Sequence, residues 1–237
     1  MSALPLGLRR VLVTGASSGI GHAVVAALLE RGAQVVGVAR RAELIDRRAV
    51  ALACDLSDPA ARKGLVERAR TALGGLDGLV YAAGVVAHQL PGAIDEASLR
   101  AQLEVDLVAP LRLGEEALPL LDEGGAMVFV TSTLAERPIV TSAVYSAAKA
   151  GLTAVTRSFA LAGAARGLRI NDVSPGVIDT DMVRGRPAAD LERLRRLHPL
   201  GRLGTAAEVA AAVLHLLAAP FTTGSTLRVD GGLLTRE

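Results

Sequence analysis

Two side chains with acid–base chemistry, Tyr145 and Lys149, lie four residues apart in the segment SAVYSAAKAGL. Residues at positions i and i+4 project from the same face of a helix, so the spacing predicts an ammonium group beside a phenol. A nearby cation stabilises the phenolate and lowers the pKa of a tyrosine from its ordinary value of about 10. We therefore expect Tyr145 to exchange a proton with a substrate near neutral pH.

A third polar residue, Ser132, lies thirteen residues before Tyr145, at the end of the apolar run AMVFVTS. Its hydroxyl can hold a carbonyl oxygen beside the phenol and orient it for proton transfer. Taken alone, Tyr145 and Lys149 also fit an ordinary helix in which the lysine stem covers a half-buried ring. The chemical interpretation gains weight from a second, independent motif near the start of the chain.

That second motif is RRVLVTGASSGIGHAVVAALLERG, which reads as a strand, a glycine-rich turn and a helix. Helical periodicity covers residues 20–30 and stops at Gly32. Gly15, Gly19 and Gly21 leave no Cβ to block a pyrophosphate, and the free N–H groups of the first helical turn attract its charge. The spacing G-x-x-x-G-x-G differs from the more common G-x-G-x-x-G. The motif predicts a binding site for the phosphates of a dinucleotide.

A framework of alternating strands and helices is predicted to position these motifs. Near-continuous apolar runs such as VVGVA and AMVFV are typical of parallel strands that are buried on both faces. Strands are expected near residues 9–14, 34–39, 49–54, 78–82, 125–131, 168–174 and 225–229. Right-handed crossovers would alternate the helices between the faces, which gives an α/β, doubly wound (Rossmann-like) sheet of seven parallel strands. Ligands of such sheets bind beyond the carboxyl ends of the strands, where the glycine turn and Ser132 fall.

The composition sets limits on the class of protein. A chain of 237 residues with 51% hydrophobic content fits one domain, residues 1–237, whose core covers both faces of a sheet. The arginines at 9, 10, 40, 41, 47 and 48 crowd the N-terminal third. No basic surface with interleaved aromatic residues is evident, so we expect no nucleic-acid partner and attribute the arginines to a phosphate-bearing cofactor.

The single cysteine and the absence of long apolar stretches indicate where in the cell the protein is expected. Cys54 lies in the apolar run AVALAC, so we expect a buried thiol that forms no internal disulfide and binds no metal. No apolar stretch reaches the ~18 residues of a membrane span, and no cleavable apolar segment precedes the first strand. The expected protein is soluble and cytoplasmic, with no membrane partner.

The chain contains, in this order, TGASSGIG, a serine after a later strand and YSAAK. With these motifs it resembles the short-chain dehydrogenase/reductase family over nearly its whole length. CDLSD, AAG, SPGVIDTDM, PLGRLGTAAEVA and TLRVDGG agree with it. The resemblance, strongest to 3-oxoacyl reductases and small carbonyl reductases, implies hydride transfer between a nicotinamide cofactor and a small ketone or secondary alcohol. It implies that Tyr145 is the acid and base, that Ser132 orients the substrate, and that Lys149 tunes Tyr145 and holds the cofactor. It also implies a homo-oligomer, a tetramer or a dimer.

The resemblance further implies which residues contact the cofactor. They are Gly15, Ser17, Ser18, Gly19, Ile20, Gly21, Arg40, Asp55, Leu56, Ala83, Gly84, Tyr145, Lys149, Pro175, Gly176, Ile178 and Thr180. Asp55 is expected to accept from the adenine amino group, or to be only a turn residue before a helix.

The choice of cofactor depends on the end of the second strand. Relatives that use NAD carry an acid at the position of Ala39, whereas here Arg40 follows and can pair with a 2′-phosphate through its forked guanidinium. This favours NADP(H). NAD(H) stays open, because Arg40 and Arg41 also fit a solvated helix start and Ser18 is not the basic residue of many NADP-using relatives.

Two departures from the family are informative. Asp106 stands where relatives have an asparagine that helps to hold a water linked to the lysine. A carboxylate cannot donate as an amide does, but it can tighten Lys149 or raise the affinity of Lys149 for a proton. We expect activity to survive with an altered pH profile. A neutral exchange and a decayed proton relay are the alternatives. Tyr81-Ala82 replaces Asn-Asn, which is expected to cost the fourth strand its side-chain bracing.

The substrate region is expected between residues 181 and 198, as a mobile lid with arginines at 184, 186, 193, 195 and 196. These arginines either meet an acidic substrate or form a solvated helix face, which is the more usual role of a charge run. His88 is expected in a surface loop or at the pocket border, and His198 and His215 are expected to be structural or exposed.

Two alternative functions remain. The connection between residues 40 and 50 is too short for a full helix, which predicts a shortened crossover. This feature and the run VSPGVIDTDM also suggest an NAD-dependent dehydrogenase of a cyclic alcohol or dihydrodiol. The other alternative is a non-catalytic, dinucleotide-binding regulator, with Asp106 as the mark of lost activity.

Overall fold

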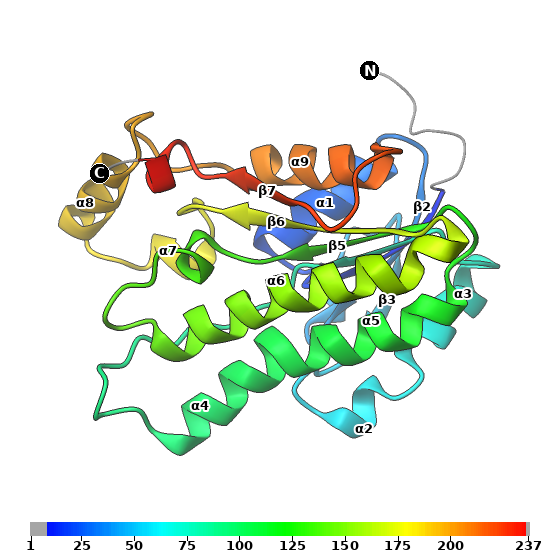
Figure 1. Cartoon of the computed structure of the whole chain (residues 1–237), viewed down its shortest axis with the longest axis horizontal. Coiled ribbons are helices and arrows are strands. Elements are labelled where there is room, and N and C mark those ends of the chain that lie inside the picture. The colour runs from blue at the N-terminus through cyan, green and yellow to red at the C-terminus, as the bar shows by residue number, and fades with distance from the viewer. Residues whose placement is uncertain (1–8, 236–237) are drawn as a thin grey trace.

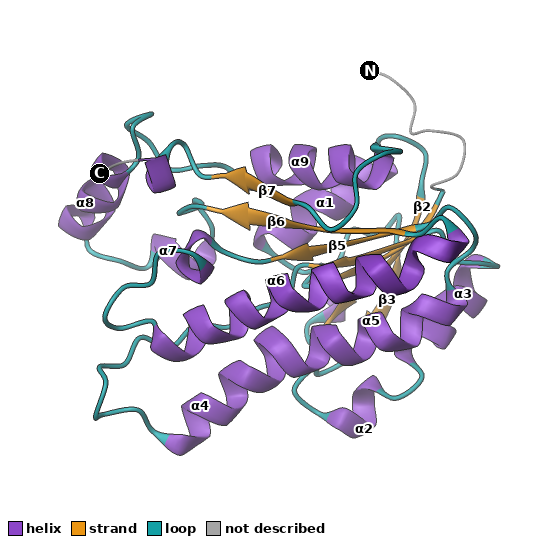
Figure 2. Cartoon of the chain, viewed as in Figure 1, coloured by secondary structure: helices purple, strands orange, loops and turns teal. Residues whose placement is uncertain are grey.

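Seven parallel strands form one sheet in the computed structural model, which describes residues 9–235 (Figure 2). The strands are β1 (Arg10–Thr14), β2 (Gln34–Ala39), β3 (Val50–Ala53), β4 (Gly78–Tyr81), β5 (Ala126–Val130), β6 (Arg169–Pro175) and β7 (Thr226–Val229). They lie in the order β3-β2-β1-β4-β5-β6-β7, so the direction of winding reverses between β1 and β4. Each boundary lies within one residue of its predicted position. The predicted fold class is confirmed.

Helices cover both faces of the sheet (Figure 1). One face carries α1 (Gly19–Leu29) and α9 (Ala206–Ala218), and the other carries α3 (Leu65–Leu73), α4 (Glu96–Leu103), α5 (Ala109–Leu120) and α6 (Ala143–Gly163). The shorter helices are α2 (Pro59–Arg62), α7 (Asp181–Arg184) and α8 (Ala188–Leu197), of which α7 and α8 lie beyond the carboxyl ends of β5 to β7. None of the described helices has both the length and the apolar character to cross a bilayer.

The core explains why the strand sequences are apolar without alternation. Along β1, Val11 and Val13 pack into the cluster beneath α1 and α9, while Leu12 between them packs into the cluster beneath α3 and α5. All three side chains are fully buried. Because both faces of the sheet are covered, consecutive residues of a strand are all in the core.

The crossover between β2 and β3 lacks a full helix, as the sequence predicts. Only a 3₁₀ turn, Ala42–Leu44, connects β2 and β3 in place of a full helix. The buried side chain of Ile45 packs over Gly37 of β2, where a Cβ would lie 2.7 Å from the Ile45 Cγ2 atom. A single side chain thus covers part of the sheet that a helix would otherwise cover.

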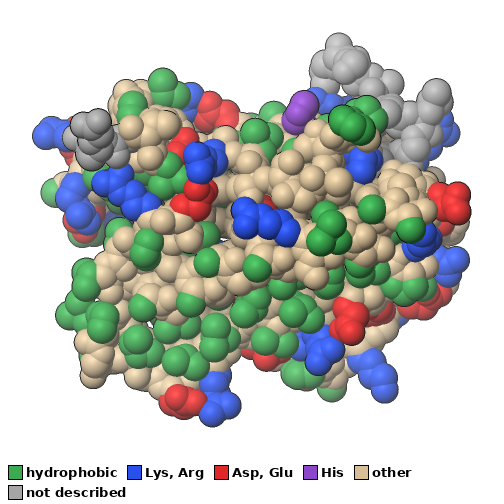
Figure 3. Space-filling view, in the orientation of Figure 1, with side chains coloured by type: hydrophobic (Ala, Val, Ile, Leu, Met, Phe, Trp, Pro, Cys, Tyr) green, Lys and Arg blue, Asp and Glu red, His purple; other side chains and the backbone are tan. Residues whose placement is uncertain are grey.

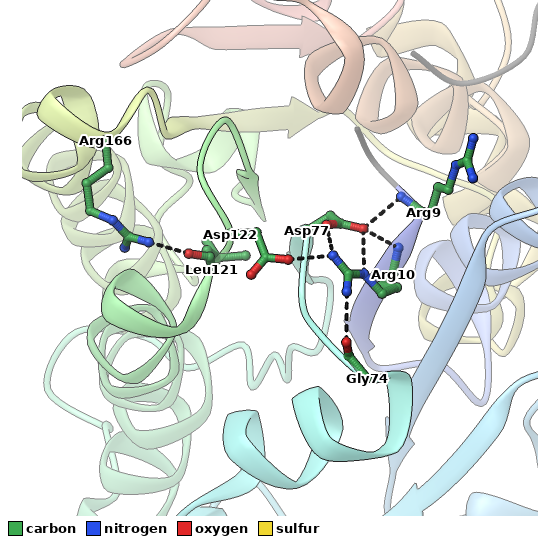
Figure 4. A network of polar contacts seen from close by, with 7 residues as sticks. All are labelled: Arg9, Arg10, Gly74, Asp77, Leu121, Asp122 and Arg166. Atoms are coloured by element: carbon green, nitrogen blue, oxygen red, sulfur yellow. Dashed lines mark hydrogen bonds and ion pairs between the residues drawn. The ribbon is translucent and has the colours of Figure 1, made fainter. Parts of the chain in front are cut away.

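A polar network joins the amino ends of the central strands (Figure 4). The guanidinium of Arg10 makes two bonds to the carboxylate of Asp77, at 2.7 and 3.1 Å, and also pairs with Asp122. Arg48 forms an exposed ion pair with Asp46. The attribution of the whole arginine cluster to a cofactor is therefore wrong for Arg10 and Arg48. Arg10 instead neutralises carboxylates where β1, β4 and β5 begin, at the edge opposite to their carboxyl ends.

Candidate active site

A cavity of about 930 Å³ lies at the carboxyl ends of the strands. Most of the predicted site residues line it: Gly15, Ser17, Ser18, Gly19, Ile20, Arg40, Asp55, Leu56, Ala83, Gly84, Ser132, Tyr145, Lys149, Pro175, Gly176, Ile178 and Thr180. Gly21 and Asp106 are not part of its wall. The structure therefore brings residues from the whole length of the chain to one place.

The glycine turn is packed too tightly for side chains. Gly15 has a φ of +68°, and a Cβ on it would lie 2.9 Å from the backbone nitrogen of Ala83. A Cβ on Gly21 would lie 2.3 Å from the carbonyl oxygen of Gly15, so Gly21 serves the packing of the turn rather than the cavity wall. Helix α1 begins directly after this turn, with its first N–H groups unused by the helix. This cradle fits the pyrophosphate of a dinucleotide.

Beyond the end of β2, the cavity wall carries Arg40, Arg41 and Asp55. The Asp55 carboxylate accepts hydrogen bonds from the backbone N–H of Ser57 at 2.9 Å and from its hydroxyl at 2.7 Å. These bonds, with the nearby charge of Arg40, lower the pKa of Asp55. Asp55 therefore has the turn role that the sequence allowed, and it also faces the cavity.

Ser132 and Tyr145 both line the cavity. Ser132 follows the end of β5, and Tyr145 lies in the first turn of α6. The Ser132 oxygen accepts from the backbone N–H of Leu134 at 3.1 Å, which fixes the side chain at the start of a 3₁₀ turn. The Ser132 side chain also lies near enough to the phenol of Tyr145 to lower its pKa. Two hydroxyl groups are thus placed to contact the same atom of a ligand.

Lys149 is buried behind the phenol. Its side chain is 3% exposed, and its Nζ donates to the carbonyl of Val130 and pairs with Asp106 Oδ1, both at 3.1 Å. The Nζ atom lies 5.6 Å from the centre of the Tyr145 ring. Since an ammonium group has three hydrogens, one remains for an acceptor in the cavity.

The net pKa of Tyr145 differs from the prediction. Burial raises it, Lys149 lowers it, Asp106 raises it and Ser132 lowers it, and the sum is a raised pKa. The predicted effect of Lys149 is confirmed, but the predicted net lowering is wrong, because burial outweighs the cation and Asp106 offsets part of its charge. The phenol is therefore protonated at neutral pH.

Asp106 is placed by a π-helical segment, Glu104–Val108, between α4 and α5. In this pattern each carbonyl bonds to the N–H five residues later, and for Val105 that residue is Pro110, which has no N–H. The hydroxyl of the fully buried Tyr81 donates to the Val105 carbonyl instead, at 2.6 Å. The expected loss of bracing at β4 is therefore wrong: Tyr81 ties the end of β4 to the segment that carries Asp106.

The Asp106 carboxylate is fully buried against Lys149. Its Oδ1 also accepts from the N–H of Val85 at 3.4 Å, while Oδ2 has no partner within residues 9–235. Burial raises the pKa of Asp106, and Lys149 lowers it in part. Burial lowers the pKa of Lys149, but Asp106 and Tyr145 outweigh burial and leave it raised. The predicted increase in the affinity of Lys149 for a proton is confirmed.

The remaining wall of the cavity is mostly apolar and comes from several distant segments. It includes Leu134, Ile139, Met182, Val183, Leu194, Leu197, Leu233 and Leu234. The last two belong to a short 3₁₀ turn, Leu233–Thr235, and no local pattern in the sequence connects this turn with the site. Over the part of the chain that the structure describes, no three His, Cys, Asp or Glu side chains are grouped to hold a metal ion.

The arginines of the predicted lid have two different roles. Arg195 and Arg196 pair with Glu192, and Arg184 pairs with Asp179, all on an exposed surface. Arg186 instead lines the cavity. Arg193 is exposed on α8 and lies outside the cavity wall. The solvated surface is therefore confirmed for Arg184, Arg193, Arg195 and Arg196, but not for Arg186.

Of the histidines, His88 lies in an exposed loop at the cavity border. His198 is buried, accepts from the N–H of Val177 at 3.2 Å and donates to the carbonyl of Leu194 at 2.8 Å. The predicted structural role of His198 is confirmed, because these bonds attach α8 to the loop after β6.

Known proteins are similar to this chain in sequence over nearly its whole length. The profile of a family described as Enoyl-(Acyl carrier protein) reductase matches residues 15–234. The chain is 40% identical to cis-4-hydroxycyclohexanecarboxylate dehydrogenase of Sinomonas cyclohexanicum, over 94% of this chain and 96% of that protein.

Two solved structures have the same fold. The ligand-free aldohexose dehydrogenase of Thermoplasma acidophilum superposes with a TM-score of 0.93 at 27% identity, covering 100% of this chain and 98% of that one. A short-chain dehydrogenase/reductase of Serratia marcescens superposes with a TM-score of 0.91 at 32% identity, covering 97% and 99%.

Proposed function

Because this chain belongs to the short-chain dehydrogenase/reductase family, we propose that it is an NADP(H)-dependent oxidoreductase that interconverts a ketone and a secondary alcohol. One observation carries the proposal: Tyr145, with Ser132 beside it and Lys149 behind its ring, faces the same cavity as the glycine turn. The substrate and the cofactor then meet inside one domain, with α7 and α8 acting as the lid.

The chain contributes proton transfer and orientation to this reaction. Bound NADPH would supply the hydride that adds to the carbonyl carbon. Ser132 donates a hydrogen bond to the carbonyl oxygen and holds it beside Tyr145, whose raised pKa keeps the phenol protonated. Tyr145 then passes its proton to this oxygen as negative charge develops, a contribution of about 10²- to 10⁴-fold in rate. Oxidation of the alcohol runs through the same groups in reverse.

Lys149 stabilises the phenolate that Tyr145 leaves behind. Its pKa is raised, because Asp106 and Tyr145 together outweigh the lowering by burial, so the ammonium stays charged across the working pH range. The N–H that Lys149 does not use within the protein is available to a ribose hydroxyl of the cofactor. Asp106 contacts no reacting atom, and it acts through Lys149 as a positioning residue.

The preference for NADP(H) is supported by Arg40 and Arg41, which line the cavity directly after β2. A guanidinium group there can form a forked pair with a 2′-phosphate. We expect a higher kcat/KM for NADPH than for NADH, and Arg40→Asp is expected to reverse this order. Arg47→Ala, at an exposed position outside the cavity wall, is the matched control. A native enzyme that works better with NADH would contradict the assignment of the cofactor.

A second candidate, a dehydrogenase of a ring alcohol that uses NAD, is favoured by the relative that is 40% identical and is named for a hydroxycyclohexane. The apolar wall formed by Leu194, Leu197 and Leu233 suits a hydrocarbon ring. Mixing the protein with either reduced nicotinamide and a panel of open-chain and cyclic ketones, while following absorbance, separates the candidates. Cofactor binding without turnover of any ketone would support the non-catalytic regulator.

The homo-oligomer is also a proposal. Hydrophobic side chains are spread over the face formed by α4, α5 and α6 (Figure 3). Leu161 on α6 is 82% exposed, and Phe221 after α9 is fully exposed. Large apolar side chains at these positions suit contact with a second copy of the chain. Light scattering of the purified protein tests this directly, since a monomeric mass at micromolar concentration would contradict it.

A further inference from the structure

Arg186 differs from its neighbours in the lid because its charge is directed to the cavity. Three of the other lid arginines pair with acids on the outer surface: Arg184 with Asp179, and Arg195 and Arg196 with Glu192. Arg186 is half-buried in the cavity wall, and its Nη2 atom lies 3.0 Å from His88 Nε2. It therefore brings a positive charge to a wall that is otherwise mostly apolar.

The contact between Arg186 and His88 determines the tautomer of the imidazole and the position of the guanidinium. A guanidinium group can only donate, so His88 Nε2 must accept and the ring hydrogen must reside on Nδ1, which lies 3.4 Å from the Thr141 hydroxyl. Partial shielding of the ring from water and the adjacent charge of Arg186 lower the pKa of His88, so the imidazole is neutral at pH 7. The imidazole holds the guanidinium in place without neutralising it.

We propose that Arg186, held by His88, binds a carboxylate of the substrate, so that the physiological substrate is a ketone or secondary alcohol that also carries a carboxylate group. The inference rests on the proposed function and names the substrate class of the same site.

Two features support a carboxylate. The guanidinium fork matches the two oxygens of a carboxylate, and one bond to His88 leaves other N–H groups of Arg186 for the ligand. The same cavity wall includes apolar side chains such as Ile139 and Leu194, which suits a substrate that joins a carboxylate to a hydrocarbon frame.

The relative that is 40% identical is named for a substrate of this kind, a ring that carries both a hydroxyl and a carboxylate.

The test compares two ring ketones with the same carbon ring, 4-oxocyclohexanecarboxylate and its methyl ester, of which only the first is charged. With either reduced nicotinamide, the native enzyme is expected to prefer the acid by about 10- to 100-fold in kcat/KM, the range of a hydrogen bond to a charged group. Arg186→Gln is expected to abolish this preference, and Arg186→Lys to keep part of it, because lysine retains the charge without the fork. Arg184→Gln, a matched change on the outer surface, is expected to keep the preference.

The outcomes separate the two proposals. Equal kcat/KM for the acid and the ester in the native enzyme, or an undiminished preference in Arg186→Gln, overturns the carboxylate site and leaves the oxidoreductase standing. Calorimetric binding of both compounds to the protein saturated with NADP⁺ gives the same comparison without turnover. Selective binding of the acid without turnover supports the carboxylate site and counts against the proposed reaction, whereas equal binding overturns the site. Melting temperatures confirm that each variant is folded.

Discussion

Replacing Asp172 with asparagine is expected to stabilise the protein at neutral and alkaline pH. Asp172 lies in β6 with no exposed surface, and its two carboxylate oxygens face the hydroxyls of Thr131 at 2.9 Å and Thr226 at 3.1 Å. The Thr131 hydroxyl has one hydrogen but two acceptors, since the carbonyl of Val173 also lies 2.9 Å away. A protonated Asp172 can donate to Thr131 and satisfy both, and so can the amide of asparagine.

The magnitude follows from the pKa of this carboxyl. Burial raises the pKa of Asp172 from 3.8 to about 6, against the hydrogen bonds from Thr131 and Thr226, which lower it. Between these values the folded chain holds a proton that the unfolded chain has released, so stability falls as the pH rises from about 4 to about 6. A shift of about two units corresponds to about 3 kcal/mol, which is lost in full above the folded pKa.

Thermal unfolding of the native chain and of Asp172→Asn, measured from pH 4 to pH 8, tests this reasoning. At pH 8 the variant is expected to melt higher by up to about 6 to 12 °C, from 2 to 4 °C for each kcal/mol in a chain of this size. At pH 4 the two are expected to agree closely, because both side chains are then neutral. Glu123→Gln removes an exposed carboxylate and is the control. A variant that is less stable than the native chain at pH 8 would refute the argument.

Two further predictions concern the segment behind the catalytic phenol. Asp106→Asn is expected to retain activity and to shift the pH–rate profile to lower pH, because Asp106 raises the pKa of Tyr145. Superimposable pH–rate profiles of the native protein and the variant would refute this effect of Asp106. Tyr81→Phe is expected to cost about 1 to 3 kcal/mol of stability, because the Val105 carbonyl loses its donor, and to lower kcat by loosening Asp106. An unchanged melting temperature in a denaturation scan would contradict the bracing role of Tyr81.

The framework of this protein was accessible from sequence because its signals are local. The continuous apolar runs fixed the strands to within a residue, and the tightly packed glycine turn marked the phosphate cradle. The spacing of Tyr145 and Lys149 placed both on one face of α6, with Ser132 at the end of β5. Patterns of this kind depend on neighbours within a few residues, and these are present in the sequence itself.

The features that the sequence did not predict depend on distant neighbours. The raised pKa of Tyr145 needs the burial that only the complete fold provides. The bond from Tyr81 to Val105 joins residues of β4 and the π-helical segment, and the pairing of Arg10 with Asp77 joins the starts of two strands. The different role of Arg186 among the lid arginines arises because the chain folds it against His88. The predicted oligomer stays a prediction.

Replacing Tyr145 with phenylalanine and measuring NADPH-dependent reduction of a ketone tests the central claim most directly, with cofactor binding measured in parallel. The phenol is the group that transfers the proton, so turnover is expected to fall by at least about 10²-fold while the protein still binds NADPH. Turnover that remains at the native level would contradict the proposed chemistry of this site.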